Sequence, residues 1–101
     1  MLRNSLYFSM IQSFKHKGLE RFFLKGKTSG IQAKHENKLR NQLAAINTAT
    51  QIEDINMPGW GLHKLSGKRK DTWSITVNGN WRVTFEFENG NAYILNYEDY
   101  H

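Results

Sequence analysis

The sequence predicts an α+β domain in which helices cover one face of a twisted, mainly antiparallel β-sheet. Three observations support this fold class: hydrophobic residues with helical spacing in the first half, alternating hydrophobic residues in the second half, and two Asn-Gly pairs between the alternating runs. The chain of 101 residues shows no repeat and no linker, and 39% of its residues are hydrophobic. We therefore expect residues 10–101 to form a single domain with one core.

The start of the chain is expected to contribute one strand. The regular pattern of the sequence begins with the predicted first strand, Met-Ile-Gln-Ser-Phe at residues 10–14. Residues 1–9 are expected to be an extension, either disordered or forming an added edge strand, and Met10 is then a second candidate for the first residue. This extension lacks a sustained apolar run, so the sequence predicts no signal peptide.

An amphipathic helix follows this strand. Leu19, Phe22 and Phe23 are spaced at i, i+3 and i+4, which predicts a helix over residues 17–25. Gly26 directly after this stretch is a typical helix stop.

A second helix is predicted over residues 32–47. Its hydrophobic face is formed by Leu39, Leu43 and Ile46. Residues 50–55 are expected to form a further short turn, so the sequence indicates two to three helices.

The second half predicts three antiparallel strands. Residues 73–77, 81–87 and 92–97 each alternate between hydrophobic and polar side chains. Asn78-Gly79 joins the first two runs, and Asn89-Gly90 joins the last two. Asn-Gly is typical of the type I′ hairpin turn, because both central residues of that turn need a positive φ. The three strands are therefore expected to form a meander that the helices cover on one face.

Positive charge is concentrated in the first half of the chain. Residues 1–40 hold nine Lys or Arg and two acidic residues, whereas residues 41–101 hold five and seven. A basic half is typical of a protein with an anionic partner such as nucleic acid, and equally of a solvated surface. The absence of cysteine fits a reducing compartment, and no run approaches the roughly 20 apolar residues of a membrane span. We expect a cytoplasmic protein that does not contact a membrane.

Metal and cofactor sites are not expected. The four histidines are far apart in the sequence, no H-E-x-x-H motif occurs, and acidic residues are sparse. The sequence also lacks a complete phosphate-binding Gly-rich loop and the G-x-S-x-G motif of a serine nucleophile.

Three segments remain that could carry chemistry: residues 62–70, residues 80–85 and residues 96–101. The first places His63 among four cations, the second sets Arg82 on the polar side of a strand, and the third contains Asp-Tyr-His. Each segment also has an ordinary structural interpretation, as a solvated basic loop, a paired strand arginine and a frayed end.

Taken together with residues 10–19 and 73–77, these segments resemble the HigB-type toxins of bacterial toxin–antitoxin pairs, a family within the RelE/ParE-like superfamily. The resemblance rests on Leu-His-Lys-Leu at 62–65, Asn-Trp-Arg-Val-Thr-Phe at 80–85 and Asn-Tyr-Glu-Asp-Tyr-His at 96–101. It extends over nearly the whole chain from Met10 and implies the RelE-like fold. The resemblance also implies three partners: a cognate HigA-type helix-turn-helix antitoxin, the ribosome and mRNA. The free toxin is expected to be a monomer.

The resemblance further implies an endoribonuclease that cleaves mRNA in the ribosomal A site without a metal ion or cofactor. In that reaction the ribose 2′-OH attacks the adjacent phosphate, giving a 2′,3′-cyclic phosphate and a free 5′-OH. The match to the family pattern assigns five catalytic residues: His63, Arg82, Asp99, Tyr100 and His101. It assigns two residues to RNA binding: Lys64 and Lys68.

The expected roles follow from the chemistry of these side chains. His101 is the preferred proton-transfer group, and Asp99 is expected to orient a histidine. Arg82 can donate to two phosphate oxygens and remains charged. Tyr100 is expected to stack on a base or to hold a hydrogen bond. Family members often have Pro and Lys where this sequence has Lys64 and Ser66, so the lysine contact is expected instead from Lys64 or Lys68.

Two other functions are compatible with the same fold. The first is a ParE-like poison of DNA gyrase, because a fold alone does not determine function. The second is a non-catalytic, basic RNA-binding module. The combination of His63, Arg82 and the Asp-Tyr-His segment favours the endoribonuclease.

Overall fold

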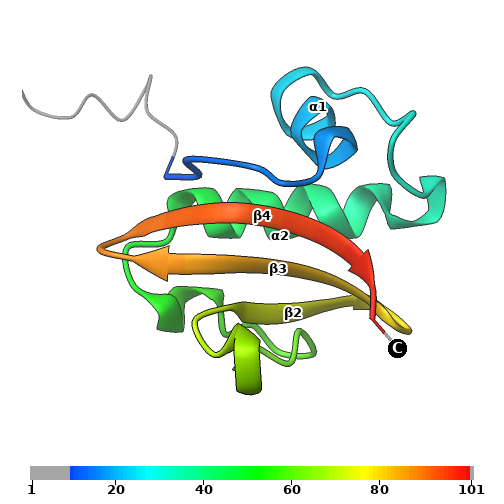
Figure 1. The fold of residues 1–101 in the computed structure, drawn as a ribbon. Helices are drawn as coiled ribbons and strands as arrows, with labels where there is room; N and C mark the ends of the chain where they lie inside the picture. Colours follow the sequence, from blue (N-terminus) through cyan, green and yellow to red (C-terminus); the bar gives the residue numbers. More distant parts are fainter. Residues whose placement is uncertain (1–9, 101) are drawn as a thin grey trace, which may run out of the picture.

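In the part of the chain that the structure describes, two α-helices and four antiparallel strands form the fold, which confirms the predicted α+β class. The computed structural model describes residues 10–100. The elements in chain order are α1 (Lys17–Lys25), η1 (Ala33–His35), α2 (Glu36–Thr48), η2 (Ile52–Ile55), β1 (His63–Lys64), η3 (Gly67–Arg69), β2 (Trp73–Asn78), β3 (Trp81–Glu88) and β4 (Asn91–Asp99), where η denotes a 3₁₀-helix. The strands lie in the order β1-β2-β3-β4. In Figure 1, α2 crosses behind the sheet and α1 lies beyond β4.

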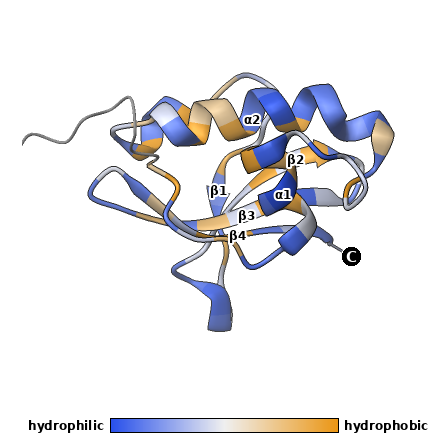
Figure 2. Cartoon of the chain, turned by 90° about the horizontal axis from the view of Figure 1, so that it is seen from above, coloured by the Kyte–Doolittle hydropathy of each residue, from blue (hydrophilic) through white to orange (hydrophobic). Residues whose placement is uncertain are grey.

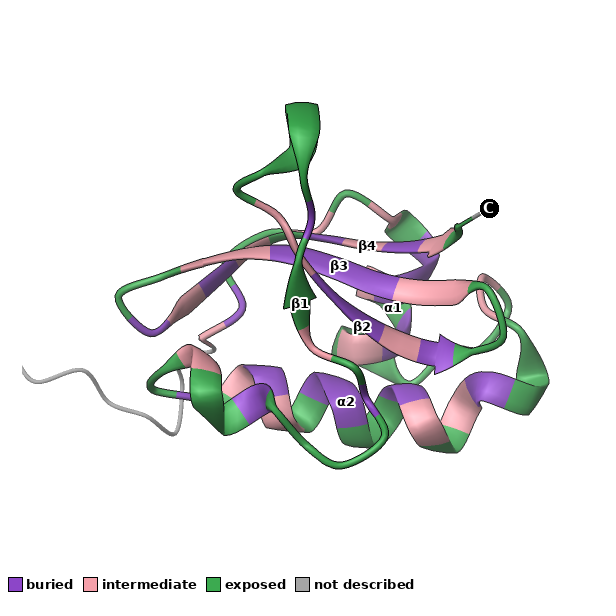
Figure 3. Ribbon diagram, turned by 90° about the horizontal axis from the view of Figure 1, so that it is seen from below, coloured by how far each residue is buried: buried purple, intermediate pink, exposed green. Residues whose placement is uncertain are grey.

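The hydrophobic core lies between α2 and one face of the sheet. α2 carries both hydrophilic and hydrophobic residues along its length (Figure 2), and its hydrophobic residues Leu39, Leu43 and Ile46 are buried as predicted. They belong to the same core cluster as Val83 and Phe85 of the central strand β3. Figure 3 shows buried residues on both sides of this contact, on α2 and on β3. The sheet is therefore held rigidly from its helical side.

The predicted helices form with one difference. α1 spans the predicted residues and ends at Gly26, which adopts a φ of 71°. The second predicted helix begins with a 3₁₀ turn, so the α-helix itself starts only at Glu36. The chain before α2 is fixed against α1, since a Cβ on Gly18 would lie 2.5 Å from the Gly30 carbonyl oxygen. This contact and the extended backbone of Gln32 delay the regular helix.

The predicted first strand forms only two bridges. Ile11 and Phe14 pair in parallel with Ala92 and Leu95 of β4, and these two isolated bridges do not extend into a continuous ladder. Residues 10–14 therefore follow the edge of β4 without being a regular strand. A two-residue strand, β1, extends the predicted meander at the opposite edge. The expectation for residues 1–9 lies outside the described residues.

One of the two hairpin turns differs from its prediction. Asn89 and Gly90 both have positive φ, 54° and 79°, which confirms the type I′ pattern. In the other hairpin Asn78 pairs with Trp81, so Gly79 and Asn80 are the central residues. Only Gly79 of these two has a positive φ, which is typical of a type II′ turn. The prediction was wrong by one residue because the register shifts between Thr76 and Asn78. Among residues 10–100, no helix is long and apolar enough to cross a membrane.

Candidate active site

The face of the sheet opposite α2 carries polar side chains, and we call it the open face. Strand alternation sends Val83 and Phe85 into the core and therefore Arg82 and Thr84 to the open face. Directly paired residues project to the same side of a sheet. The open face therefore also receives the partners of Arg82 and Thr84: Thr76, Ser74, Glu98 and Asn96. The exposed turn η3 stands on this side of the sheet (Figures 1 and 3).

Arg82 has the rigid setting that phosphate binding requires. It lies in the central strand β3, half-buried, with Glu98 opposite it on β4. Its Nη1 donates to the carbonyl oxygens of Gly79 at 2.6 Å and Trp81 at 3.1 Å. Both bonds use one nitrogen, so Nη2 and Nε can still donate to a phosphate.

His63 is exposed on β1, and its hydrogen bond fixes the orientation of its ring. Its Nδ1 lies 2.9 Å from the carbonyl oxygen of Gly61. A carbonyl oxygen can only accept, so in the neutral ring the proton resides on Nδ1. Nε2 then presents a lone pair, which suits a group that takes up a proton.

The sheet register brings His63 and Arg82 to the same face. His63 pairs with Ser74, Ser74 with Thr84, and Thr84 follows Arg82 by two residues. Two strand spacings separate their backbones by about 10 Å across the sheet, and two residues add about 7 Å along it. Both groups thus face the same side of the sheet, with the Arg82 guanidinium held toward the β2–β3 turn.

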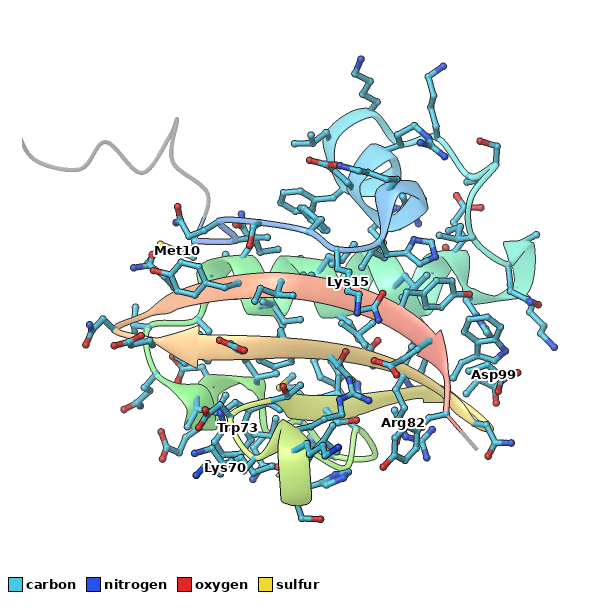
Figure 4. All side chains as sticks on the ribbon, viewed as in Figure 1. Met10, Lys15, Lys70, Trp73, Arg82 and Asp99 are labelled. Carbon is cyan, nitrogen blue, oxygen red and sulfur yellow. The ribbon has the colours of Figure 1, made fainter. Side chains whose placement is uncertain are left out.

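The other catalytic residues predicted from the sequence lie at the end of β4. Asp99 pairs with Trp81, so the register sets it on the helical side of the sheet, whereas Tyr100 alternates back to the open side. The Tyr100 backbone N–H donates to the Asn80 carbonyl oxygen at 2.7 Å, and its side chain is exposed. Figure 4 shows Arg82 and Asp99 at this same end of the sheet. His101 lies outside the described residues, so its role remains a prediction.

The two predicted RNA-binding lysines have different positions. Lys64 pairs with Trp73, and its Nζ lies 5.6 Å from the centre of the Trp73 ring. Alternation along β1 therefore directs Lys64 away from the side of His63. Lys68 is exposed in η3, which stands on the open side. Of the two lysines, Lys68 thus lies in a turn on the open side, whereas Lys64 is directed away from it.

Sequence reasoning missed an ion pair on the open face. Arg69 of η3 donates from Nη1 and Nη2 to the two carboxylate oxygens of Glu98, at 3.1 and 2.7 Å. These hydrogen bonds lower the pKa of Glu98 below its usual value and raise that of Arg69. Strand alternation could have placed Glu98 on the same face as Asn96, because the two residues are two positions apart in one strand. No periodic signal places the side chain of Arg69, because the loop before β2 has no regular pattern.

The chain matches a family model described as the RelE-like toxin of the type II toxin–antitoxin system HigB, over residues 12–101. It is also 56% identical over 92 residues to a protein of Proteus vulgaris named endoribonuclease HigB, covering 91% of this chain and 100% of that protein. The chain belongs to the HigB-like toxin family. This finding confirms the resemblance that the motifs indicated.

Beneath the open face, this HigB-like toxin buries a polar cluster around the Tyr97 hydroxyl. The hydroxyl oxygen accepts the Gln32 backbone N–H at 3.2 Å and lies 2.6 Å from His35 Nδ1. The hydroxyl oxygen has a second lone pair, so either group can be the donor in this contact. His16 Nδ1 accepts the Leu19 backbone N–H at 3.0 Å as the N-cap of α1, so this bond requires the neutral His16 ring. Burial disfavours the charged form of the His35 ring.

Because both histidine rings favour the neutral form, we expect the HigB-like toxin to lose stability in mild acid. Burial, assisted by Arg21 and Lys34 respectively, lowers the pKa of His16 and of His35 below 6.5. The unfolded state therefore binds more protons below about pH 6.5, so the free energy of unfolding is highest above that pH and falls as the pH decreases. Urea unfolding at about pH 7.5 and 5.5 measures the difference. Replacing His35 by Gln is expected to reduce the dependence of the free energy of unfolding on pH, whereas replacing the exposed His63 by Gln is not. An equal change of the free energy of unfolding with pH in both variants would contradict this explanation.

A metal centre finds no support in the part of the HigB-like toxin that the structure describes. Within residues 10–100, no group of three His, Cys, Asp or Glu side chains could hold a metal ion. The groups that gather on the open face are instead imidazole, guanidinium, hydroxyl and carboxylate.

Proposed function

We propose that this HigB-like toxin is an endoribonuclease that cleaves mRNA in the ribosomal A site and thereby inhibits translation in the cytoplasm. The observation that carries the proposal is the shared open face of His63 on β1 and Arg82 on β3 of one sheet. The 56% identity to a protein named endoribonuclease HigB supports the same activity.

The chemistry proposed is transesterification by the RNA itself. The 2′-OH gives its proton to a base, the 2′-oxygen forms a bond to the adjacent phosphorus, and the bond from phosphorus to the 5′-oxygen breaks. An acid protonates that 5′-oxygen, so the products are a 2′,3′-cyclic phosphate and a 5′-OH. Neither step requires a metal ion or cofactor, provided that side chains stabilise the added phosphoryl charge.

The candidate catalytic residues suit these steps. His63, with its Nε2 lone pair directed away from Gly61, is the proposed base, and His101 is the proposed acid. Arg82 donates to the phosphoryl oxygens from a side chain that is already held at Nη1. Tyr100 offers an exposed ring at the same end for a base or a hydrogen bond. Asp99 is proposed to orient His101, its neighbour by two residues.

The proposed partners are mRNA, the ribosome and a cognate HigA-type helix-turn-helix antitoxin, and the free toxin is proposed to be a monomer. Basic side chains are concentrated in the first half of the sequence, which includes α1. Ribosomal RNA is a suitable anionic surface for α1, because such contacts are electrostatic and need no particular sequence. Lys68 is proposed to contact mRNA from η3, and Lys64 to contact RNA at the edge of the sheet.

Primer extension on messages from cells after brief induction tests this function. We expect cuts within translated codons that disappear when the start codon of the message is removed. An Arg82→Ala variant is expected to lose about 10²–10³ in cleavage rate, because it removes a donor to the charge that develops in the transition state. Supercoiling defects with intact messages would indicate a gyrase poison instead. RNA binding without any cuts would indicate a non-catalytic module.

A further inference from the structure

We infer that Arg69 binds a backbone phosphate of the RNA on the open face and that Glu98 is the residue that positions it. This inference deepens the proposed function, on which it rests. It adds a phosphate subsite at Arg69, a residue of segment 62–70 to which the sequence motifs assigned no role.

The first observation is the geometry of the pair. Arg69 and Glu98 are joined by two parallel hydrogen bonds, at 3.1 and 2.7 Å. Glu98 is itself held by its own strand and the neighbouring one, because Oε2 accepts from Thr84 Oγ1 at 2.7 Å and from Asn96 Nδ2 at 3.3 Å. The carboxylate thus fixes the guanidinium of an exposed turn onto the rigid central strands.

The second observation is that Arg69 keeps donors for a ligand. A guanidinium has five N–H groups in one plane, and the bidentate contact with Glu98 uses two of them. The remaining three can donate to phosphate oxygens beside the carboxylate. Glu98 also lies directly opposite Arg82 in the sheet, so Arg69 is fixed to the strand residue that pairs with Arg82.

The third observation is a small cavity beside Arg69. It has a volume of about 140 Å³. Its lining includes the side chains Lys15, Arg69, Thr84, Glu86, Ile94 and Asn96. Ile94, one of these lining residues, is 47% exposed and has a φ of 58°. A positive φ is strained for a β-branched residue, and such strain is concentrated at functional sites. Lys15 and Arg69 thus approach this cavity from different parts of the chain.

A comparable ion pair elsewhere gives a matched control. Arg40 Nη2 lies 2.6 Å from Glu36 Oε2 on α2, and both side chains are substantially exposed. This pair joins two residues one helical turn apart, on an element that covers the other face of the sheet. A purely structural role for the Arg69–Glu98 pair would make Arg69→Ala and Arg40→Ala alike in every functional measurement.

Binding of RNA provides the first test. The probe is a short single-stranded RNA with 2′-O-methyl riboses, which cannot be cleaved, titrated with toxin at several salt concentrations. We expect Arg69→Ala to weaken binding about tenfold, the effect of losing one charge-assisted hydrogen-bonding group. The dependence of log K on log salt should decrease by about 0.7, which corresponds to one phosphate contact on a single strand. Arg40→Ala should leave both quantities unchanged. An unchanged affinity and salt dependence for Arg69→Ala would overturn the phosphate subsite.

Cleavage kinetics provide the second test, which concerns Glu98. Glu98→Gln removes a negative charge from the RNA-binding face, so KM is expected to stay constant or decrease. kcat is expected to fall about tenfold because Arg69 loses its bidentate anchor. In an Arg69→Ala background, Glu98→Gln should have no further effect on kcat, since Glu98 acts through Arg69. Arg69→Lys should keep the salt dependence but not kcat, because lysine lacks the planar fork.

The contrary results are equally specific. A higher kcat for Glu98→Gln would mean that the carboxylate only competes with phosphate for Arg69, and would overturn its positioning role. The same fall of kcat in the Arg69→Ala background would overturn it too. If the wild-type protein bound RNA but left ribosome-bound mRNA intact, the proposed function would fail, whereas the Arg69 subsite would still be judged by the binding test.

Discussion

Replacing His101 by alanine is expected to lower the rate of mRNA cleavage by about 10²–10⁴-fold, because the variant lacks the proposed acid for the departing 5′-oxygen. The loss should appear in kcat, with KM nearly unchanged, since an acid acts on the transition state more than on the bound substrate. Single-turnover cleavage of mRNA on programmed ribosomes measures this effect.

Two controls separate this chemical role from a loss of structure. The Tm of the His101→Ala variant should equal that of the wild-type protein. Imidazole added to the solution should restore part of the activity of His101→Ala and none of the activity of Arg82→Ala. Full activity of the His101→Ala variant without added imidazole would remove His101 from the mechanism.

The largest effect on stability is expected for Phe85→Ala. Phe85 is the largest fully buried side chain of the described residues, with an exposed fraction of 0%, and lies in the central strand over α2. Truncating such a side chain costs about 3–5 kcal/mol, through lost burial and the cavity that remains. A small domain has a free energy of unfolding of about 5–15 kcal/mol, so this variant should lose a large fraction of its stability.

Urea unfolding of the Phe85→Ala variant provides the measurement. Leu24→Ala is the matched control, because Leu24 is a hydrophobic residue of α1 that is 63% exposed. It should change the free energy of unfolding by less than about 0.5 kcal/mol. Similar losses of the free energy of unfolding in both variants would show that Phe85 is not part of the buried core between β3 and α2.

The periodic parts of this fold could be predicted from the sequence. Hydrophobic spacing located α1, the hydrophobic face of α2 and the three long strands, because burial on one side imposes a period on each element. The start of α2 could not be predicted, since the contact between Gly18 and Gly30 joins segments that no local pattern relates. The turn after β2 was displaced by one residue because a register shift depends on the pairing of two strands.

The candidate site divides in the same way. Arg82 follows from strand alternation, and His63 was found through its resemblance to a family motif. The Arg69–Glu98 pair escaped prediction because the contact spans 29 residues and begins in an irregular turn. Such a contact is determined by how the chain folds back over the sheet, which only the tertiary structure reveals.

The segment beside β4 affects how this protein behaves in solution. Exposed strand edges are templates for intermolecular pairing and aggregation. Here residues 11–14 bond to the outer edge of β4 over its first half, and the Trp60 carbonyl accepts the Thr76 N–H at the outer edge of β2. Within the described residues, both margins of the sheet are thus partly occupied by the protein's own backbone. This arrangement disfavours fibrous or amorphous self-association and helps the protein to stay dispersed when no partner is bound.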